Sequence, residues 1–391
     1  MEGDFIRINK WLTPLSWFYG MAVKLRNTMF DVGLLKSRPF DVPVISVGNI
    51  TVGGAGKTPH VEYLVTLLKD KYDVAVLSRG YKRRTKGFIV AGSSTTMPDI
   101  GDEPYQMKQK FPQVTIAVDK DRCHGIDQLT GDNPRLDVVL LDDAFQHRYV
   151  KPGINILLVD YHRLIIYDRL LPAGRLREPL SGKNRADIVI VTKCPRELKP
   201  MEYRVITKAM CLYPYQQLYF TTLAYDRLRS AFPGSAPGPT PQMADLKDIH
   251  VLLLTGIASP EQMVHDLKPH APHLTPLTFA DHHQFGKKDV ERINATFAVL
   301  PEPRCIITTE KDLTRLQTTD GLSDDVRRHT YVLPVRIEFM QDQEDMFNNH
   351  ILSYVLKNSR NSILAKGKDD NKPNDSHRAG DRPRTISFRN N

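Results

Sequence analysis

Short apolar segments alternate with amphipathic ones along most of this chain. Continuous runs rich in β-branched residues occupy residues 43–50, 73–78, 114–118, 137–141, 154–159 and 187–192. Apolar residues at helical spacing fill the intervals at residues 60–69 and 103–110. Strands that are apolar on both sides are buried on both faces of a sheet, and helices must cover those faces. The pattern therefore predicts an α/β protein with a mostly parallel sheet, whose ligands bind at the carboxyl ends of the strands.

A second series of apolar runs follows a loop-forming segment. Residues 230–242 are dense in proline, glycine and serine, which is typical of a linker. Further strands are predicted at residues 250–255, 274–279, 305–309 and 331–338. The chain has 391 residues, and a single core stops growing at roughly 250–300 residues. We therefore expect two lobes.

The predicted division has five parts. They are an N-terminal helix at 1–40, a larger α/β domain at 41–228, a linker or loop at 229–243, a smaller α/β lobe at 244–365 and a basic tail at 366–391. The tail is polar and poor in apolar residues, so we expect it to be disordered.

The N-terminal segment combines an apolar helical face with basic flanks. Large apolar residues recur every three or four positions at Trp11, Leu15, Phe18, Ala22, Leu25 and Met29. Lysines and arginines flank them at Lys10, Lys24, Arg26, Lys36 and Arg38. Such an amphipathic helix can lie in a membrane interface, and the same pattern is typical of a helix packed on the protein's own core. The charge-free run at residues 11–23 is shorter than the ~20 residues that span a bilayer.

Residues 44–58, VISVGNITVGGAGKT, lead from a predicted strand through glycines into a lysine and a threonine. Backbone amides of such a loop can surround a phosphate, the lysine can reach the outer phosphates, and the threonine hydroxyl can bind Mg²⁺. The expected nucleotide-binding residues are Thr51, Val52, Gly53, Gly54, Ala55, Gly56, Lys57 and Thr58. The usual motif has glycine where this chain has Thr51, which leaves the loop geometry open. The fold class we predict is a P-loop NTPase-like sheet flanked by helices, with a second smaller α/β lobe and an N-terminal amphipathic helix.

Two adjacent carboxylates, Asp142 and Asp143, end the predicted strand at residues 137–141. A P-loop protein places the carboxylate that attends its magnesium ion at such a strand end. Successive side chains of an extended backbone point to opposite sides, so the two aspartates should have different partners. We expect Thr58, Asp142 and Asp143 to form the metal site, and the sequence leaves open which aspartate meets the metal.

Composition does not identify the phosphate acceptor. Lysine and arginine exceed aspartate and glutamate by 54 to 45, an excess that suits a nucleotide, a nucleic acid or an anionic membrane. Carboxylates at Gly101-Asp102-Glu103-Pro104 are candidates, although such residues commonly cap helices. Asp281-His282-His283 is another candidate, and alone it is equally typical of surface histidines. The four cysteines are scattered, which indicates free thiols and neither a zinc site nor a disulfide framework.

Taken together, these motifs closely resemble the tetraacyldisaccharide 4'-kinase family, the lipid A 4'-kinases of Gram-negative bacteria. The resemblance runs to about residue 355 and rests on SVGNITVGGAGKTP at 46–59, LSRGY at 77–81, GDEP at 101–104, LLDDAFQHR at 140–148, LLPAGRLREP at 170–179, DHH at 281–283 and TTEKD at 308–312. It implies an ATP- and Mg²⁺-dependent kinase of lipid A biosynthesis. The acceptor would be the 4'-hydroxyl of a tetraacylated glucosamine disaccharide 1-phosphate, at the cytoplasmic face of the inner membrane.

The resemblance also implies roles for single residues. Asp102 matches the family's catalytic carboxylate and His282 the histidine paired with it, and the two would meet when the lobes close. Lys57 would neutralise charge on the transferring phosphoryl group. Guanidinium groups suit phosphate oxygens, so the candidate substrate or phosphate contacts are Arg79, Arg122, Arg175 and Arg177, with a surface salt bridge as the alternative for each. Independently of the resemblance, Thr192 and Lys193 at a strand end and Lys311 and Asp312 in TTEKD are candidates to approach the nucleoside, and the sequence leaves open which residues contact it.

An acceptor with four acyl chains favours membrane contact for the N-terminal helix, hence a peripheral protein at the inner-membrane surface. We expect no nucleic-acid partner, because the cations form no long patch interleaved with aromatic residues, and we infer no obligate protein partner. The alternative function is a P-loop nucleotide-dependent switch or metallochaperone-type NTPase. Such a protein would share the glycine loop but should carry an Asn-Lys-x-Asp guanine-binding motif, which this sequence lacks.

Overall fold

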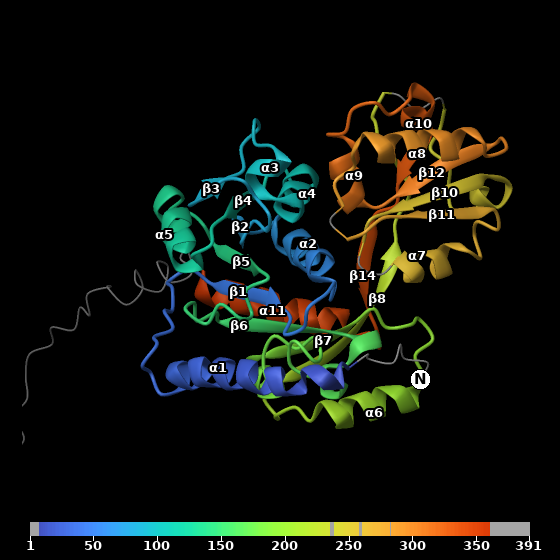
Figure 1. Ribbon diagram of the computed structural model, residues 1–391. Coiled ribbons are helices and arrows are strands. Elements are labelled where there is room, and N and C mark those ends of the chain that lie inside the picture. Colours follow the sequence, from blue (N-terminus) through green and yellow to red (C-terminus); the bar gives the residue numbers. More distant parts are fainter. Residues whose placement is uncertain (1–7, 235–237, 258–259, 282, 360–391) are drawn as a thin grey trace, which may run out of the picture.

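The computed structural model describes residues 8–234, 238–257, 260–281 and 283–359 (Figure 1). Two sheets organise these residues, a large one on which most of the first half of the chain is built and a smaller one beside it. Among the predicted features, His282 and the tail at 366–391 lie outside the described residues.

The large sheet has nine strands in the order β14-β8-β7-β6-β1-β5-β2-β4-β3. Their bounds are β1 Val44–Gly48, β2 Val74–Ser78, β3 Ile89–Val90, β4 Thr115–Val118, β5 Val138–Asp142, β6 Ile154–Asp160, β7 Ile188–Thr192, β8 Gln217–Tyr225 and β14 Val335–Phe339. The outermost pairs, β3 with β4 and β14 with β8, are antiparallel, and the strands between them are parallel. The predicted mostly parallel sheet is confirmed. Its central strands are buried along their whole length, as apolar runs without alternation require.

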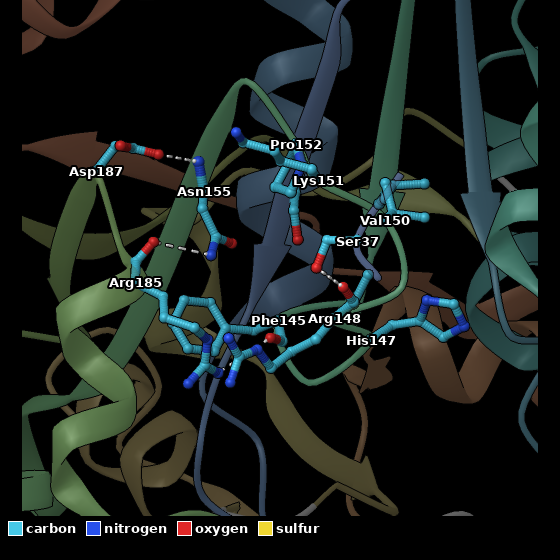
Figure 2. Close-up of a pocket in the computed structure, with 13 residues that line it drawn as sticks. Ser37, Phe145, His147, Arg148, Val150, Lys151, Pro152, Asn155, Arg185 and Asp187 are labelled. Atoms are coloured by element: carbon cyan, nitrogen blue, oxygen red, sulfur yellow. Dashed lines mark hydrogen bonds between the residues drawn. The ribbon is translucent and has the colours of Figure 1, made fainter. Parts of the chain in front are cut away.

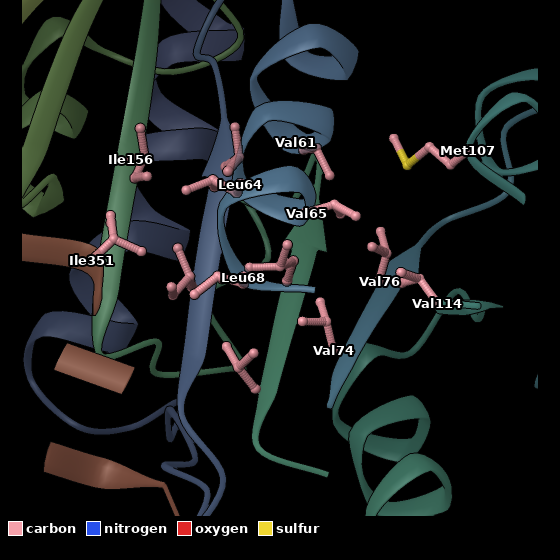
Figure 3. Packing of buried hydrophobic residues seen from close by; sticks show 14 of the residues in the cluster. Val61, Leu64, Val65, Leu68, Val74, Val76, Met107, Val114, Ile156 and Ile351 are labelled. Atoms are coloured by element: carbon pink, nitrogen blue, oxygen red, sulfur yellow. The ribbon is translucent and has the colours of Figure 1, made fainter. Parts of the chain in front are cut away.

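Helices cover both faces of this sheet. One face carries α2 (Lys57–Leu68), α4 (Asp102–Lys110) and α11 (Glu344–Asn358), which share a continuous apolar core with the strands. Figure 3 shows Leu64, Val65 and Leu68 of α2 packed over the strands. The other face packs against α5 (Arg122–Asp132) and α6 (Pro200–Met210). The remaining short elements are α3 Met97–Ile100, η2 Tyr161–Arg163, η3 Ile165–Tyr167 and η4 Leu180–Arg185.

The smaller sheet forms the centre of the second lobe. Its order is β11-β10-β12-β13-β9, with bounds β9 Arg229–Ser230, β10 His250–Thr255, β11 Leu274–Thr278, β12 Arg304–Thr308 and β13 Thr330–Val332. Helices α8 (Lys287–Ala298), α9 (Glu310–Leu316) and α10 (Asp324–His329) contribute to one core, and α7 (Pro260–Leu267) contributes to the core on the opposite face. A short helix, η5 (Asp245–Asp248), precedes β10.

The prediction of a single strand at residues 331–338 was wrong. The structure has two strands in this region, β13 in the small sheet and β14 in the large one, and Pro334 lies between them. Proline has no N–H to donate to a ladder, so a strand rarely continues through it. The chain then returns to the first lobe, where β14 pairs with β8 and α11 packs in the large core. The predicted lobe at 244–365 therefore differs from the structure at its C-terminal end. β14 and β8 form one edge of the large sheet and extend toward the second lobe (Figure 1).

The predicted N-terminal helix is present as η1 (Lys10–Leu12) followed by α1 (Thr13–Asp31). Ser16 fastens it to the first lobe, because its hydroxyl donates to the Leu170 carbonyl at 3.0 Å and accepts from the Ala173 amide at 2.9 Å. The opposite side of the helix is apolar and exposed, at Trp11, Leu15, Trp17, Phe18, Met21 and Leu25. Within the described residues, no helix has the length and apolar character that crossing a membrane requires.

Candidate active site

The glycine loop connects β1 to α2, as its sequence predicts. Gly53 and Gly56 have backbone φ angles of +123° and +78°, a region that favours glycine. Thr51, which replaces the motif's first glycine, instead pairs with Leu176 in an isolated β-bridge. Its backbone is not among the positive-φ positions, so a side chain is tolerated there. The Val52 amide donates to the Arg175 carbonyl at 2.8 Å, which ties the loop to residues 175–176.

A buried histidine holds the far end of the loop. His60 Nδ1 donates to the Gly56 carbonyl at 2.7 Å, and Nε2 accepts from the Thr221 hydroxyl at 3.1 Å. Burial lowers the pKa of His60 to about 4, so the ring is neutral at physiological pH. The loop, which follows β1, is thereby joined to β8, and β6 and β7 lie between these two strands in the sheet.

Lys57 and Asp143 meet at the carboxyl ends of β1 and β5. The Lys57 ammonium lies 3.4 Å from Asp143 Oδ1 and 3.5 Å from Asn49 Oδ1. Arg177 approaches the same carboxylate, with Nη1 3.7 Å from Asp143 Oδ2. The structure therefore gathers three predicted site residues around one point above the glycine loop.

Asp142 and Asp143 have different surroundings, as predicted, although only Asp142 belongs to the strand. Asp142 is completely buried, and its Oδ2 accepts from the Ser78 hydroxyl at 3.1 Å. Its Oδ1 has no hydrogen-bond partner among the residues that the structure describes. Burial, followed by the charges of Glu103 and Asp143, raises the pKa of Asp142 to about 7. Asp143 is one-third exposed and adopts φ +47°, outside the strand.

These residues fit a magnesium ion. Mg²⁺ prefers carboxylate and hydroxyl oxygens, and Asp142, Asp143 and the Thr58 hydroxyl supply them at the end of β5 and the start of α2. The buried Asp142 oxygen without a partner in the described part of the chain is the kind of atom that a cation stabilises. A divalent cation would also favour the ionised carboxyl group and so counteract the raised pKa of Asp142.

The four candidate arginines occupy different positions. Arg122 is buried near the carboxylate pair. Burial lowers the pKa of Arg122, and the charges of Asp142 and Asp143 oppose that change. Arg79 is exposed, and its charge also lowers the pKa of Arg122, which places it in the same neighbourhood. Arg177 contacts Asp143, whereas Arg175 is exposed and meets the glycine loop through its carbonyl.

Asp102 is the first residue of α4, directly after a sharp turn. Gly101 has φ +94°, and a Cβ there would lie 2.8 Å from the Tyr81 carbonyl oxygen, so only glycine fits. The Asp102 carboxylate contacts Arg315 of the second lobe, with Nη2 2.5 Å and Nε 3.0 Å from Oδ2. The neighbouring Glu103 raises the pKa of Asp142, so the start of α4 faces the end of β5.

The second lobe brings residues of TTEKD and DHH together. Lys311 Nζ lies 3.1 Å from Asp281 Oδ1, next in sequence to His282. Asp312 is completely buried and accepts from the Gly256 amide at 2.9 Å and the Thr309 hydroxyl at 2.7 Å. Within the described residues, Asp312 is therefore bound to its own lobe.

Lys193 joins the strand end of β7 to the glycine loop. Its ammonium donates to the Gly54 carbonyl and lies 2.8 Å from Asp160, while the Thr192 hydroxyl donates to the Ala55 carbonyl at 3.0 Å. Lys193 also lines a cavity of about 700 Å³ between the lobes. Residues 193–197 form one side of this cavity and α7 forms another, with Gln262, His265 and Asp266.

A second cavity lies away from these residues. It has a volume of about 250 Å³ and is bounded by β1, β6 and residues 144–152 (Figure 2). Asn155 lines it and is held by Arg185 and Asp187, since its side-chain amide donates to the Arg185 carbonyl at 3.1 Å and its backbone amide to Asp187 at 2.8 Å. None of the predicted site residues lines this cavity.

Sequence reasoning missed Asn49 and Arg315. Asn49 lies in the SVGN segment, and only the fold shows that its amide oxygen faces Lys57. Arg315 follows Asp312 by three positions in α9, a spacing that puts both side chains on one face of the helix. That spacing is the one sequence signal that Arg315 carries.

Comparisons with known proteins show which family this chain resembles. A family model described as Tetraacyldisaccharide-1-P 4'-kinase matches residues 8–355. The Tetraacyldisaccharide 4'-kinase of Phocaeicola vulgatus is 58% identical over 366 residues, which cover 93% of this chain and 99% of that protein. The protein of the same name from Porphyromonas gingivalis is 43% identical over 359 residues, which cover 90% of this chain and 99% of that protein.

A solved structure is also similar. It is the "apo" form of LpxK from Aquifex aeolicus in complex with ATP, with a TM-score of 0.67 and 30% sequence identity, and the match covers 88% of this chain and 98% of that one. The family match over most of the chain and the shared fold lead to one conclusion: this chain belongs to the tetraacyldisaccharide-1-P 4'-kinase family.

Proposed function

We propose that this protein transfers the γ-phosphate of ATP to the 4'-hydroxyl of a tetraacylated glucosamine disaccharide 1-phosphate, a step of lipid A biosynthesis. Membership of the kinase family supports the reaction, and the similar Aquifex aeolicus structure is in complex with ATP. The observation that carries the proposal is the meeting of Lys57, Asp143 and Arg177 above the glycine loop, with the start of α4 facing them.

Lys57 and the loop amides would bind the phosphates of ATP. The loop residues 51–58 present backbone amides at the start of α2, where the helix dipole also favours an anion. Thr58, Asp142 and Asp143 would hold Mg²⁺, which neutralises phosphate charge when bound. Arg177 and the buried Arg122 add positive charge beside the same carboxylates.

Asp102 is the proposed general base. A sugar hydroxyl is a poor nucleophile, and a carboxylate within hydrogen-bond reach can accept its proton as the phosphoryl group arrives. We propose His282 as its partner, from the DHH segment, whose first residue Asp281 lies beside Lys311. Because Asp102 and DHH belong to different lobes, closure of the lobes would complete the site and exclude water.

The nucleoside would occupy the cavity of about 700 Å³ beside Lys193. Lys193 contacts the Gly54 carbonyl of the phosphate loop and also lines this cavity, so the cavity lies beside the loop that would bind the phosphates of ATP. Lys193 and Thr192 are therefore the proposed neighbours of the nucleoside, whereas Asp312 is buried in its own lobe.

The lipid acceptor requires an enzyme that works at a membrane surface, which we propose is the cytoplasmic face of the inner membrane. The exposed apolar side of α1 supports this proposal, with Trp11 93%, Trp17 74% and Phe18 69% exposed. Complete burial of such side chains contributes roughly 1.5–3 kcal/mol each. Nearby lysines and arginines add about 1 kcal/mol each on an anionic surface.

The test is transfer of radiolabelled γ-phosphate from ATP to the 1-phosphorylated acceptor in vesicles. We expect a bis-phosphorylated lipid from the wild-type protein. Asp102→Asn and His282→Asn should each lower kcat, by about 10²- to 10⁴-fold for the base, and leave ATP affinity near the wild-type value. Release of inorganic phosphate without a labelled lipid would overturn the proposal and favour the alternative, a nucleotide-dependent switch.

A further inference from the structure

Arg315 is a charged residue in the interior of the second lobe. Its side chain is 0% exposed, and it is among the largest fully buried side chains of the described chain. Removing a guanidinium group from water is costly unless carboxylates and hydrogen bonds compensate. Two aspartates supply that compensation, one from each lobe.

Asp312 fixes the guanidinium on its own lobe. Arg315 Nη1 lies 3.2 Å from Asp312 Oδ1, and the same nitrogen is 3.5 Å from the Gly256 carbonyl. Asp312 is in turn bound by the Gly256 amide and the Thr309 hydroxyl. A planar guanidinium held along one edge has little freedom to rotate, so its other edge has a fixed direction.

That other edge meets Asp102 of the first lobe. Nη2 and Nε both approach Oδ2, at 2.5 and 3.0 Å, although the residues are 213 positions apart in sequence. The backbone at Asp102 is fixed independently by the glycine turn at Gly101. Asp102 is therefore held through its backbone at the start of α4 and through its carboxylate by Arg315 of α9.

We infer that Arg315 is a positioning residue for Asp102 in the phosphoryl transfer. The inference rests on the proposed function, in which Asp102 is the general base. A carboxylate bound through one oxygen cannot rotate freely about its χ2 bond, so the direction of the other oxygen is set. Correct orientation of a catalytic group is worth large factors in rate, and a misplacement of about 1 Å can cost about 100-fold.

A separate group of ion pairs links the same two lobes through Glu310. Lys110 of α4 lies 2.6 Å from Glu62 and 3.1 Å from Glu310 of α9. Arg229 lies 2.6 Å from the other oxygen of Glu310 and is more than half exposed. Arg229 therefore provides a matched control, an arginine that pairs with α9 but not with the proposed base.

The experiment compares Arg315→Lys with Arg229→Lys in the full-length protein, using vesicle-borne acceptor. Lysine keeps the charge but cannot span Asp102 and Asp312 with a planar fork. We expect Arg315→Lys to lower kcat by about 100-fold, with the KM for ATP within about threefold of wild type. Arg229→Lys should retain kcat within about twofold, because an exposed ion pair contributes little.

A double-mutant cycle separates positioning from a structural role. If Arg315 acts through Asp102, Arg315→Lys should cause no further loss of kcat in an Asp102→Asn background. An equal loss in both backgrounds, or a wild-type kcat for Arg315→Lys, would overturn the inference. If thermal unfolding shows that Arg315→Lys does not fold, the cycle is repeated with Arg315→Gln. In addition, methylguanidinium added to Arg315→Ala should restore kcat at least tenfold. Absence of this rescue in a folded variant would count against a positioning role.

The same measurements distinguish failure of the proposed function. If Asp102→Asn alone retains wild-type kcat, Asp102 is not the base and the assignment of the mechanism fails first. If Asp102→Asn is impaired but Arg315→Lys is not, the proposed function stands and the role of Arg315 is rejected.

Discussion

The Lys57 ammonium lies 3.4 Å from the Asp143 carboxylate, across the space between the start of α2 and the end of β5. The lysine side chain is only 12% exposed, and Asn49 contacts it from β1's end. Lys57 is therefore held over the glycine loop by groups from two neighbouring strands.

Replacing Lys57 should abolish most of the kinase activity. Lys57→Met removes a positive charge from the place where phosphate charge develops, and loss of one such group typically lowers kcat by about 10²- to 10³-fold. Steady-state phosphate transfer measures this effect. Lys69→Met, at the other end of α2 and paired with the exposed Asp70 at 2.9 Å, should remain near wild-type activity. Equal activity of both variants would contradict the role of Lys57.

A methyl group at Gly101 should destabilise the protein and displace Asp102. The Cβ of Gly101→Ala would lie 2.8 Å from the Tyr81 carbonyl oxygen at a φ of +94°, so we expect a loss of more than about 1 kcal/mol of unfolding free energy. Gly131→Ala is the matched control, because Gly131 lies in α5 with no atom within 4 Å of a Cβ. Alanine should stabilise that helix by about 0.4–1 kcal/mol. Urea unfolding that ranks the variants in the opposite order would contradict this account.

Serine at exposed positions of α1 should weaken membrane binding without destabilising the fold. We expect the triple variant Trp11→Ser, Phe18→Ser, Leu25→Ser to partition less into anionic vesicles, because its apolar area is lost from the exposed side. Its thermal midpoint should change little, since surface substitutions usually have small effects. Val299→Ser, at a 79% exposed position of the second lobe, controls for general loss of apolar surface. Unchanged sedimentation with vesicles would assign α1 a purely structural role.

Glu62 should make the stability of the protein depend on pH. Burial is the main cause that raises its pKa from 4.5 to about 7, although Lys110 opposes the change. Between those values the folded protein retains a proton that the unfolded chain has released, so the free energy of unfolding falls as pH rises through this window. Glu62→Gln removes this titration, and its unfolding free energy should fall less between about pH 5 and pH 7. Urea titrations at several pH values test this, and identical slopes for both proteins would contradict it.

The four thiols should react at different rates. Cys211 is exposed and Cys123 is partly buried, while burial raises the pKa of both Cys194 and Cys305 to about 12. Because the thiolate is the reactive form, a thiol reagent at about pH 8 should modify Cys211 first and Cys194 and Cys305 only after unfolding. Peptide mapping by mass spectrometry identifies the modified residues, and rapid labelling of Cys305 in the native protein would show that its core opens.

The local features of this protein could be predicted from its sequence. Unbroken β-branched runs define strands such as β1 and β5, because strands buried on both faces need apolar side chains throughout. The glycine loop and the aspartates at the end of β5 follow from the same reasoning, since ligand-binding residues gather at the carboxyl ends of parallel strands. Different environments for Asp142 and Asp143 were also predicted, but strand alternation is not their cause, because Asp143 lies just outside β5 with φ +47°.

Relationships between distant segments could not be predicted in this way. The return of β14 and α11 to the large sheet depends on the break between β13 and β14 at Pro334, and the apolar residues at 331–338 read as one strand. Arg315 carries no local sign of its contact with Asp102, because the two residues meet only when α4 and α9 pack together.

Residues close together in the chain were enough to predict the central strands, the phosphate loop and the family resemblance, because each of these is a local pattern. Tertiary structure alone decided which lobe holds the C-terminal helix, how Thr51 fits a loop that usually starts with glycine, and which second-lobe side chain contacts Asp102. The physical reason is that burial and ion pairing depend on distances in space, and segments far apart in the chain acquire those distances only on folding.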